Sequence, residues 1–235
     1  MASIHEGDFI RLSYTGSYDD TIFDTTDEDK AKEADIFNPS AKYGPVVIRV
    51  GNKHVILGLD EDLPGKEPGY SGEIDILPDK AFGAHDPDRV ESFPKSTFKE
   101  KPVRGQHVKI EEKGEGVIID AIGGRVLVDF NHPLSGKTLH YTYTIDEVVE
   151  DETEQLKGLI QLYAGRDLEM TIENGIVTIT LPPGITYDRR WVLWRSRIIH
   201  EAFEAIPGIQ EIVLVETFKR PASDSTTPVE SRMTL

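Results

Sequence analysis

The chain has 235 residues, of which 38% are hydrophobic and 29% are charged, and its formal net charge is −16. This length suits one large domain or two to three smaller ones, and no apolar run reaches the ~18 residues of a membrane span. An acidic surface repels nucleic acid and anionic membranes, so neither is expected as a partner. The absence of cysteine excludes disulfides and thiolate metal sites, and the N-terminal residues show no secretory pattern; we therefore expect a cytoplasmic protein.

The first third of the chain reads as short strands around one short helix. Residues 27–43 are polar and irregular, which predicts a loop with a helical turn around Ala31–Asp35. Residues 53–65 predict a short helix, because apolar side chains recur on one side of it. Alternating or β-branched runs predict strands at 7–16, 22–25, 46–50 and 71–77.

Residues 87–130 change character and predict a small β module. They begin with turn-rich sequence and continue with three strand patterns at 106–112, 116–124 and 125–131. A longer strand follows at 138–149. Its alternation places four apolar residues on one face: Leu139, Tyr141, Tyr143 and Ile145.

The last third predicts a separate α+β arrangement. Two strand patterns flank Asn174-Gly175, a dipeptide typical of hairpin turns. Residues 187–206 predict the longest helix of the chain, with Thr186 as its N-cap, and a strand follows at 209–218. The tail, residues 221–235, has little to bury and is predicted to be disordered.

Polar clusters in the sequence do not match any familiar catalytic arrangement. The seven histidines are scattered without metal-ligand spacing, so no metal site is expected. No serine-nucleophile or phosphate-binding motif is present. His132 and His140 lie among hydroxyl side chains, but His140 is on the strand face opposite the apolar one and His132 precedes a proline. We therefore expect neither histidine to act as a base.

The order of several motifs resembles the FKBP-type peptidyl-prolyl cis–trans isomerases. The motifs are GDFIRLSYTG, IFDTT, VVIRVGNKHVILGLDEDLPGKEPG, AFG and NHPLSGKTLHYTYTI. A β module between AFG and NHPLSGK resembles the SlyD-like branch, which carries a domain inserted in the flap, and a further C-terminal domain resembles the long archaeal form. The resemblance implies an α+β fold: a bent antiparallel sheet wrapped on a short helix, an inserted small β domain and a C-terminal ββαβ domain. These domains would span residues 1–86 with 131–152, residues 87–130 and residues 153–220.

The resemblance also implies a proline pocket between the short helix and the sheet, with no cofactor. Catalytic roles would fall on Tyr14, Asp24, Ile56 and Tyr141, and the Ile56 N–H would hold a substrate carbonyl. The remaining substrate-binding residues would be Phe23, Val46, Val55, Leu59, Phe82 and Leu139. Two departures are visible: Phe82 replaces the usual tyrosine, and the 27–43 segment is longer than in minimal members and is expected to overhang the site.

The implied function is isomerisation of X–Pro bonds combined with a chaperone activity on unfolded or proline-containing polypeptides. The inserted domain would hold unfolded chains with four apolar residues: Phe93, Phe98, Val103 and Ile118. The alternative is a holdase with a vestigial isomerase pocket, because Phe82 lacks the hydroxyl. Trp191 and Trp194 either fill the core of the C-terminal domain or form a homodimer interface through residues 153–220, and the sequence leaves both open.

Overall fold

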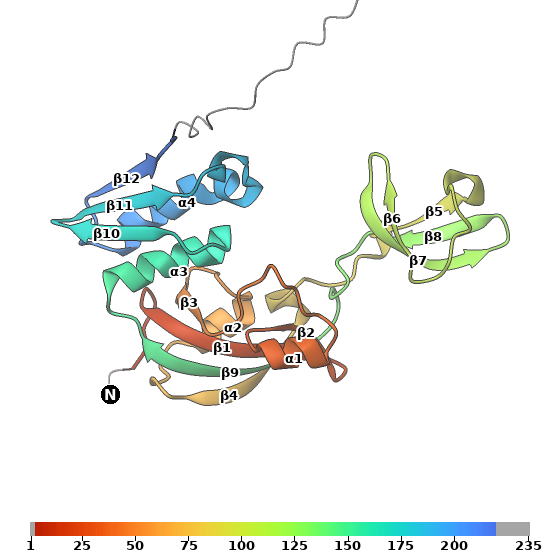
Figure 1. Ribbon diagram of the computed structural model, residues 1–235. Coiled ribbons are helices and arrows are strands. Elements are labelled where there is room, and N and C mark those ends of the chain that lie inside the picture. Colours follow the sequence, from red (N-terminus) through yellow and green to blue (C-terminus); the bar gives the residue numbers. More distant parts are fainter. Residues whose placement is uncertain (1–2, 220–235) are drawn as a thin grey trace, which may run out of the picture. The chain divides into compact units, whose positions relative to one another are not determined.

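The computed structural model describes residues 3–219, and the chain divides into two compact units, residues 1–162 and 163–235. The first unit contains a five-stranded antiparallel sheet in the order β2-β1-β9-β4, with β3 pairing with β1 (Figure 1). Its strands are β1 (Phe9–Tyr18), β2 (Thr21–Thr25), β3 (Val46–Arg49), β4 (Ser71–Ile76) and β9 (Leu139–Val148). The α+β fold class with an antiparallel sheet is therefore confirmed.

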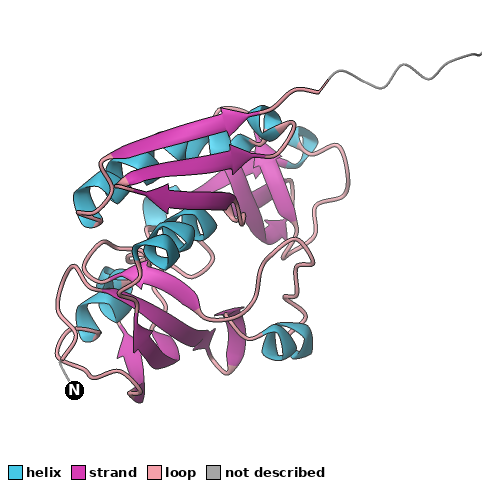
Figure 2. Cartoon of the chain, turned by 60° about the vertical axis from the view of Figure 1, so that its left-hand side comes forward, coloured by secondary structure: helices cyan, strands magenta, loops and turns pink. Residues whose placement is uncertain are grey.

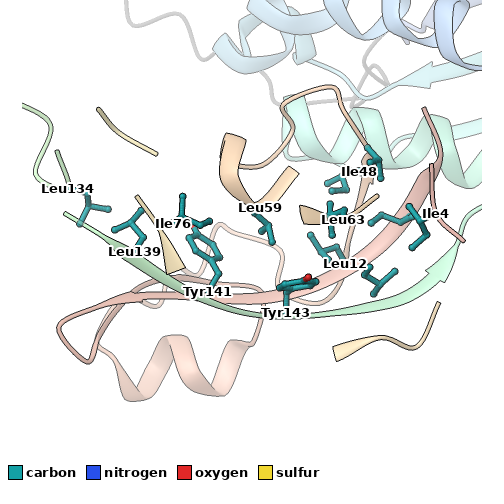
Figure 3. Close-up of a cluster of buried hydrophobic side chains, with 13 residues drawn as sticks. Ile4, Leu12, Ile48, Leu59, Leu63, Ile76, Leu134, Leu139, Tyr141 and Tyr143 are labelled. Atoms are coloured by element: carbon teal, nitrogen blue, oxygen red, sulfur yellow. The ribbon is translucent and has the colours of Figure 1, made fainter. Parts of the chain in front are cut away.

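Two short helices accompany this sheet. Helix α1 (Glu28–Glu33) begins after Asp27, whose side chain accepts hydrogen bonds from the N–H groups of Asp29 and Lys30. Helix α2 (Leu57–Asp62) supplies Leu59 to the core, where it points toward the sheet residues Tyr141 and Leu12 (Figure 3). The alternation predicted for β9 is confirmed, because its four apolar side chains are all buried: Leu139, Tyr141, Tyr143 and Ile145.

Residues 90–129 form a second, four-stranded antiparallel sheet with its own small core. Its strands are β5 (Val90–Pro94), β6 (His107–Ile110), β7 (Gly114–Ile122) and β8 (Arg125–Asp129), in the order β5-β8-β7-β6. The core consists of Ile118, Val126, Val128 and Phe130. Strand β5 falls in a stretch that reads as turns in the sequence; it forms because it pairs along β8. Single 3₁₀ turns lie at Pro78–Lys80, Pro87–Arg89, Lys95–Thr97 and Ile185–Tyr187.

The chain enters and leaves this small sheet through two adjacent segments, which are hydrogen-bonded to each other. The Phe130 N–H donates to the Arg89 carbonyl at 3.0 Å, and the Gly136 N–H donates to the Gly83 carbonyl at 2.8 Å. The paired segments therefore form a two-stranded neck.

Helix α3 (Glu152–Ala164) was not predicted from the sequence. Its residues Leu156, Leu159 and Ile160 are buried. Gly158 allows a close approach to β3, since a Cβ at this position would lie 2.5 Å from the Cβ of Val47. The unit boundary after residue 162 thus falls inside α3.

The second unit has a three-stranded sheet and one long helix, α4 (Arg189–Ala205), which lies against one face of the sheet (Figure 2). Strand β10 (Glu169–Glu173) pairs antiparallel with β11 (Ile176–Leu181), and β11 pairs parallel with β12 (Glu211–Glu216). The hairpin prediction is confirmed, because Asn174 and Gly175 join β10 to β11 with φ values of 52° and 79°.

One prediction for this unit is wrong, and another concerns residues that the structure does not describe. The N-cap of α4 is Asp188 rather than Thr186, because the Asp188 carboxylate accepts a hydrogen bond from the Trp191 N–H. The predicted disorder of residues 221–235 lies outside the described residues. Within residues 3–219, no helix is both long and apolar enough to cross a membrane.

Candidate functional site

Strands β1, β2 and β9 bring three of the predicted aromatic residues together. In the sheet, Gly16 lies opposite Asp24 on one side and Tyr141 on the other. The ring centroid of Tyr141 lies 5.9 Å from that of Tyr14 and 5.9 Å from that of Phe23. A Cβ on Gly16 would lie 2.8 Å from ring carbons of both Phe23 and Tyr141, so the absence of a side chain permits this packing.

A hydrogen bond links Tyr14 to Asp24 in this cluster. The Tyr14 hydroxyl donates to Asp24 Oδ2 at 3.0 Å. Burial raises the pKa of the Tyr14 hydroxyl, and the charge of Asp24 raises it further; burial also raises the pKa of Tyr141. Loss of hydration raises the pKa of Asp24, although the hydrogen bond from Tyr14 acts in the opposite direction. Both hydroxyls therefore stay protonated near neutral pH, and the site contains no phenolate base.

A hollow of about 300 Å³ lies beside the aromatic cluster. Four residues of the predicted pocket line it: Tyr14, Phe23, Asp24 and Val46. Its other side is formed by the segment between α1 and β3, residues 36–44, which we call the overhanging loop. Its lining combines aromatic and aliphatic side chains with polar ones, among them Asn38 and Lys42.

The start of α2 packs on the same core as the aromatic cluster. Val55 and Ile56 are half-buried and pack on the core cluster that contains Tyr141. Ile56 is the N-cap of α2, and within residues 3–219 its N–H donates no hydrogen bond. Leu59 and Leu139 are both 0% exposed, so they support the pocket from the core and do not line the hollow.

Phe82 is not among the residues that line the hollow. Its ring stacks on His132 with centroids 4.1 Å apart and an interplanar angle of 7°. This stacking covers one face of each ring, and Phe82 remains 36% exposed. His140 Nδ1 lies 2.8 Å from Asp75 Oδ1 on the outer face of the sheet, and His132 Nδ1 accepts a hydrogen bond from the Leu134 N–H. Both histidines thus have structural partners outside the hollow.

The four-stranded sheet of residues 90–129, which we call the inserted sheet because it lies between β4 and β9 in the sequence, carries a larger groove of about 830 Å³. Phe93 and Phe98, two of the residues predicted to hold unfolded chains, line this groove. Val103 is 58% exposed but does not line it. Ile118 corrects the prediction, because it is 0% exposed and fills the core of the small sheet.

Two features of the site were not identified from the sequence. One is Gly16, whose motif Tyr-Thr-Gly offered the signal: a glycine within a strand often marks a close approach. The other is the identity of the lining residues within the 27–43 segment that we expected to overhang the site, chiefly Ile36 and Tyr43. Their signal was the presence of large side chains in a segment that is otherwise polar.

Comparison with known proteins places these observations in a family. The profile of the FKBP-type peptidyl-prolyl cis-trans isomerase family matches residues 2–118, and the FKBP26 C-terminal profile matches residues 152–219. A short-type peptidyl-prolyl cis-trans isomerase of Methanocaldococcus jannaschii is 33% identical over 153 residues, which cover 64% of this chain and 98% of that protein.

Two bacterial relatives give a similar result. The FKBP-type 16 kDa peptidyl-prolyl cis-trans isomerase of Escherichia coli (strain K12) is 31% identical over 110 residues, covering 44% of this chain and 74% of the relative. The FKBP-type peptidyl-prolyl cis-trans isomerase SlyD of Haemophilus influenzae is 30% identical over 117 residues, covering 48% of this chain and 62% of the relative. The motifs, the sheet and these relatives agree: the chain belongs to the FKBP-type peptidyl-prolyl cis–trans isomerase family and also carries an FKBP26-type C-terminal region.

Proposed function

We propose that the protein isomerises X–Pro peptide bonds in the hollow beside Tyr14, Phe23 and Asp24. The observation that carries this proposal is the aromatic cluster of Tyr14, Phe23 and Tyr141 next to a hollow of about 300 Å³, in a chain of this family. Val46 adds an aliphatic side chain to the lining, so a proline ring placed against Val46, Tyr14 and Phe23 would lose contact with water on that side.

The physical basis is the polarity of the amide. Rotation about X–Pro crosses a barrier of ~18–20 kcal/mol because the planar bond is conjugated. The twisted bond has lost that conjugation and is less polar, so water stabilises the planar form more than the twisted one. A pocket with little water removes this preference, and each ~1.4 kcal/mol removed from the barrier gives a tenfold acceleration.

In this mechanism the polar groups orient the substrate and transfer no proton. The Ile56 N–H, at the start of α2, is available to hold a substrate carbonyl. Asp24 fixes the hydroxyl of Tyr14, which keeps that ring against Tyr141. Since the pKa values of Tyr14 and Tyr141 are both raised, neither hydroxyl ionises at neutral pH.

A refolding assay tests the isomerase activity. The client is a protein whose slow refolding phase is limited by one cis-proline, and the protein is added in substoichiometric amounts. We expect acceleration of the slow phase, a large loss with Tyr141→Ala or Asp24→Ala, and no loss with Tyr187→Ala, a control whose side chain is 92% exposed in the second unit. Equal activity of all three variants would show that the site is assigned wrongly.

We further propose that the groove of the inserted sheet holds unfolded chains and delivers them to the hollow. The groove exposes Phe93 and Phe98 together with Val108 and Ile110. Because the two sites belong to one chain, a polypeptide held in the groove has a high effective concentration at the hollow. Removal of residues 88–130 is expected to weaken binding of unfolded protein much more than turnover of a short peptide. Equal losses in the two assays would contradict this division of labour.

The second candidate function is a holdase whose isomerase site is vestigial. It is favoured by Phe82, which stands where the family usually has tyrosine, stacks on His132 and does not line the hollow. The refolding assay separates the two functions: a holdase would suppress aggregation of the client and leave the proline-limited phase unchanged.

We also propose that the second unit forms a homodimer. The two tryptophans have different environments. Trp191 is 2% exposed and belongs to the core, whereas Trp194 is 44% exposed. Trp194 lies on α4 beside Val192 and Leu193, which are 48% and 62% exposed, and such apolar surface is typical of an interface. Sedimentation should show a dimer that Leu193→Asp converts to a monomer; a wild-type chain that stays monomeric at every concentration would refute the proposal.

A further inference from the structure

Strand β4 is the last strand at one edge of the five-stranded sheet (Figure 1). Within residues 3–219, β4 pairs with β9 and with no other strand. The Ile145 N–H donates to the Tyr70 carbonyl, and the ladder continues in the same register along β4. Because hydrogen-bonded pairs alternate in an antiparallel ladder, the N–H and C=O groups of Glu73 and Asp75 point away from β9. This edge therefore presents main-chain donors and acceptors to a further strand.

A groove lies beside this edge, between β4 and helix α2, and we call it the edge groove. Its volume is about 330 Å³. Gly58 allows α2 to lie close to β4, since a Cβ at this position would overlap the Ile76 side chain. Ile74, Ile76 and Leu77 line the edge groove, and Leu77 is 59% exposed. Because side chains alternate along a strand, every second side chain of a strand added to β4 would meet this aliphatic lining.

The charged groups around the edge groove are mainly acidic. Four acidic residues and one lysine are among its lining residues: Glu61, Asp62, Asp75, Asp79 and Lys80. Lys80 Nζ lies 2.7 Å from Glu61 Oε2, so the charge of this lysine is already paired.

The outer face of β4 is also acidic. The side chains of Glu73 and Asp75 are 75% and 72% exposed there, and both carboxylates lie within 4 Å of a ring nitrogen of His140, at 3.8 and 2.8 Å. Basic side chains on an added strand would meet opposite charges at these two residues. A second copy of the same acidic edge would be repelled, so the chemistry of β4 favours a basic partner over self-association.

We propose that the edge of β4 and the edge groove bind an extended segment of a partner protein in which apolar and basic side chains alternate. The segment adds to the sheet as a further strand and forms main-chain hydrogen bonds with Glu73 and Asp75. Its apolar side chains enter the edge groove, and its basic side chains lie over the two carboxylates. The site needs no proline and shares no lining residue with the hollow, so it does not depend on the isomerase function.

The test uses the full-length protein and a short capped peptide of alternating valine and lysine, without proline. Amide hydrogen exchange is followed by NMR with and without the peptide. We expect slower exchange at the N–H groups of Glu73 and Asp75, because the added strand covers them. Binding should weaken at high salt, since the charges that meet are exposed, and a peptide of alternating valine and glutamate should bind much more weakly.

Three results would contradict the proposal. A valine–lysine peptide that does not bind, or that binds while exchange at Glu73 and Asp75 stays unchanged, would overturn the site. Protection confined to the inserted sheet would overturn it as well. Equal binding of the lysine and glutamate peptides would overturn the basic class of partner.

Two variants assign the binding to the edge. Glu73→Pro removes an outward N–H and no ladder hydrogen bond, which edge strands tolerate, and the Kd of the valine–lysine peptide should rise by about five- to tenfold. Glu73→Lys keeps the main chain and reverses one charge, so it should weaken binding several-fold. Glu173→Lys is the matched control, because it makes the same change of charge at an exposed position of β10, and it should keep the wild-type affinity.

Turnover of a short proline peptide serves as the check on the fold. Glu73 does not line the hollow, so both Glu73 variants should retain this activity. Wild-type affinity for the valine–lysine peptide in both Glu73 variants would refute the assignment.

Discussion

Gly16 offers the sharpest test of the packing at the hollow. In Gly16→Ala the new Cβ would lie 2.8 Å from ring carbons of both Phe23 and Tyr141, where ordinary contacts are 3.4–4 Å. The two rings must therefore separate by several tenths of an ångström. Overpacking of this kind costs about 1–3 kcal/mol, which corresponds to a loss of roughly 2–12 °C in Tm for a protein of this size. Because the displaced rings belong to the proposed catalytic wall, we expect kcat/KM to fall by about tenfold or more.

The assays for this variant are thermal unfolding and turnover of a short proline peptide. Gly124→Ala is the matched control, since a Cβ there meets nothing within 4 Å. Both substitutions lower the entropy of the unfolded chain by a similar amount, so the difference between them reports the contact with the rings. If Gly16→Ala matched Gly124→Ala in both assays, the rings would not be packed as described.

Three further predictions concern other parts of the chain. Phe98→Ser should weaken suppression of client aggregation several-fold, whereas Ile122→Ser, outside the groove, should not; equal effects would place the binding surface elsewhere. Burial raises the pKa of Asp129, but hydrogen bonds from His85 and Asn131 outweigh this effect and leave the pKa lowered. The Asp129 carboxylate therefore stabilises the fold above the ordinary carboxyl pKa, and this stabilisation is lost as the pH falls through the folded-state pKa. Asp129→Asn should therefore flatten the acid limb of a stability-against-pH curve, and an unchanged limb would show that the contribution is absent. Trp191→Ala should destabilise the second unit by about 3–5 kcal/mol, measured by denaturant unfolding, because the side chain is 2% exposed; a loss below ~1 kcal/mol would contradict its place in the core.

Much of the sheet could be predicted because its residues follow simple alternation. Strand β9 has a buried side chain at every second position from Leu139 to Ile145, and the Asn174-Gly175 turn needs backbone conformations that these two residue types adopt readily. Helix α3 was missed because Gly158 weakens the helical signal in the middle of the segment. A glycine is needed at position 158 because the helix lies very close to Val47 there, and the local sequence does not show this contact.

The site shows a similar division between motif and tertiary structure. Tyr14, Phe23 and Tyr141 were found through the order of family motifs, and the structure brings them together. The stacking of Phe82 on His132 joins residues that are distant in the chain, so its position could not be derived from the motif around it. Ile118 lies in a triplet of apolar residues beside a bulge in β7, and the bulge changes which side chain faces the core.

The two-stranded neck has a consequence for local unfolding of the four-stranded sheet. Because Arg89 is hydrogen-bonded to Phe130, and Gly83 to Gly136, the polypeptide leaves and returns at nearly the same point. The four-stranded sheet of residues 90–129 is thus joined to the first sheet at one place, and the pairing of β4 with β9 does not depend on any strand of the smaller sheet. Local unfolding of the smaller sheet would therefore leave in place the strand that carries Tyr141.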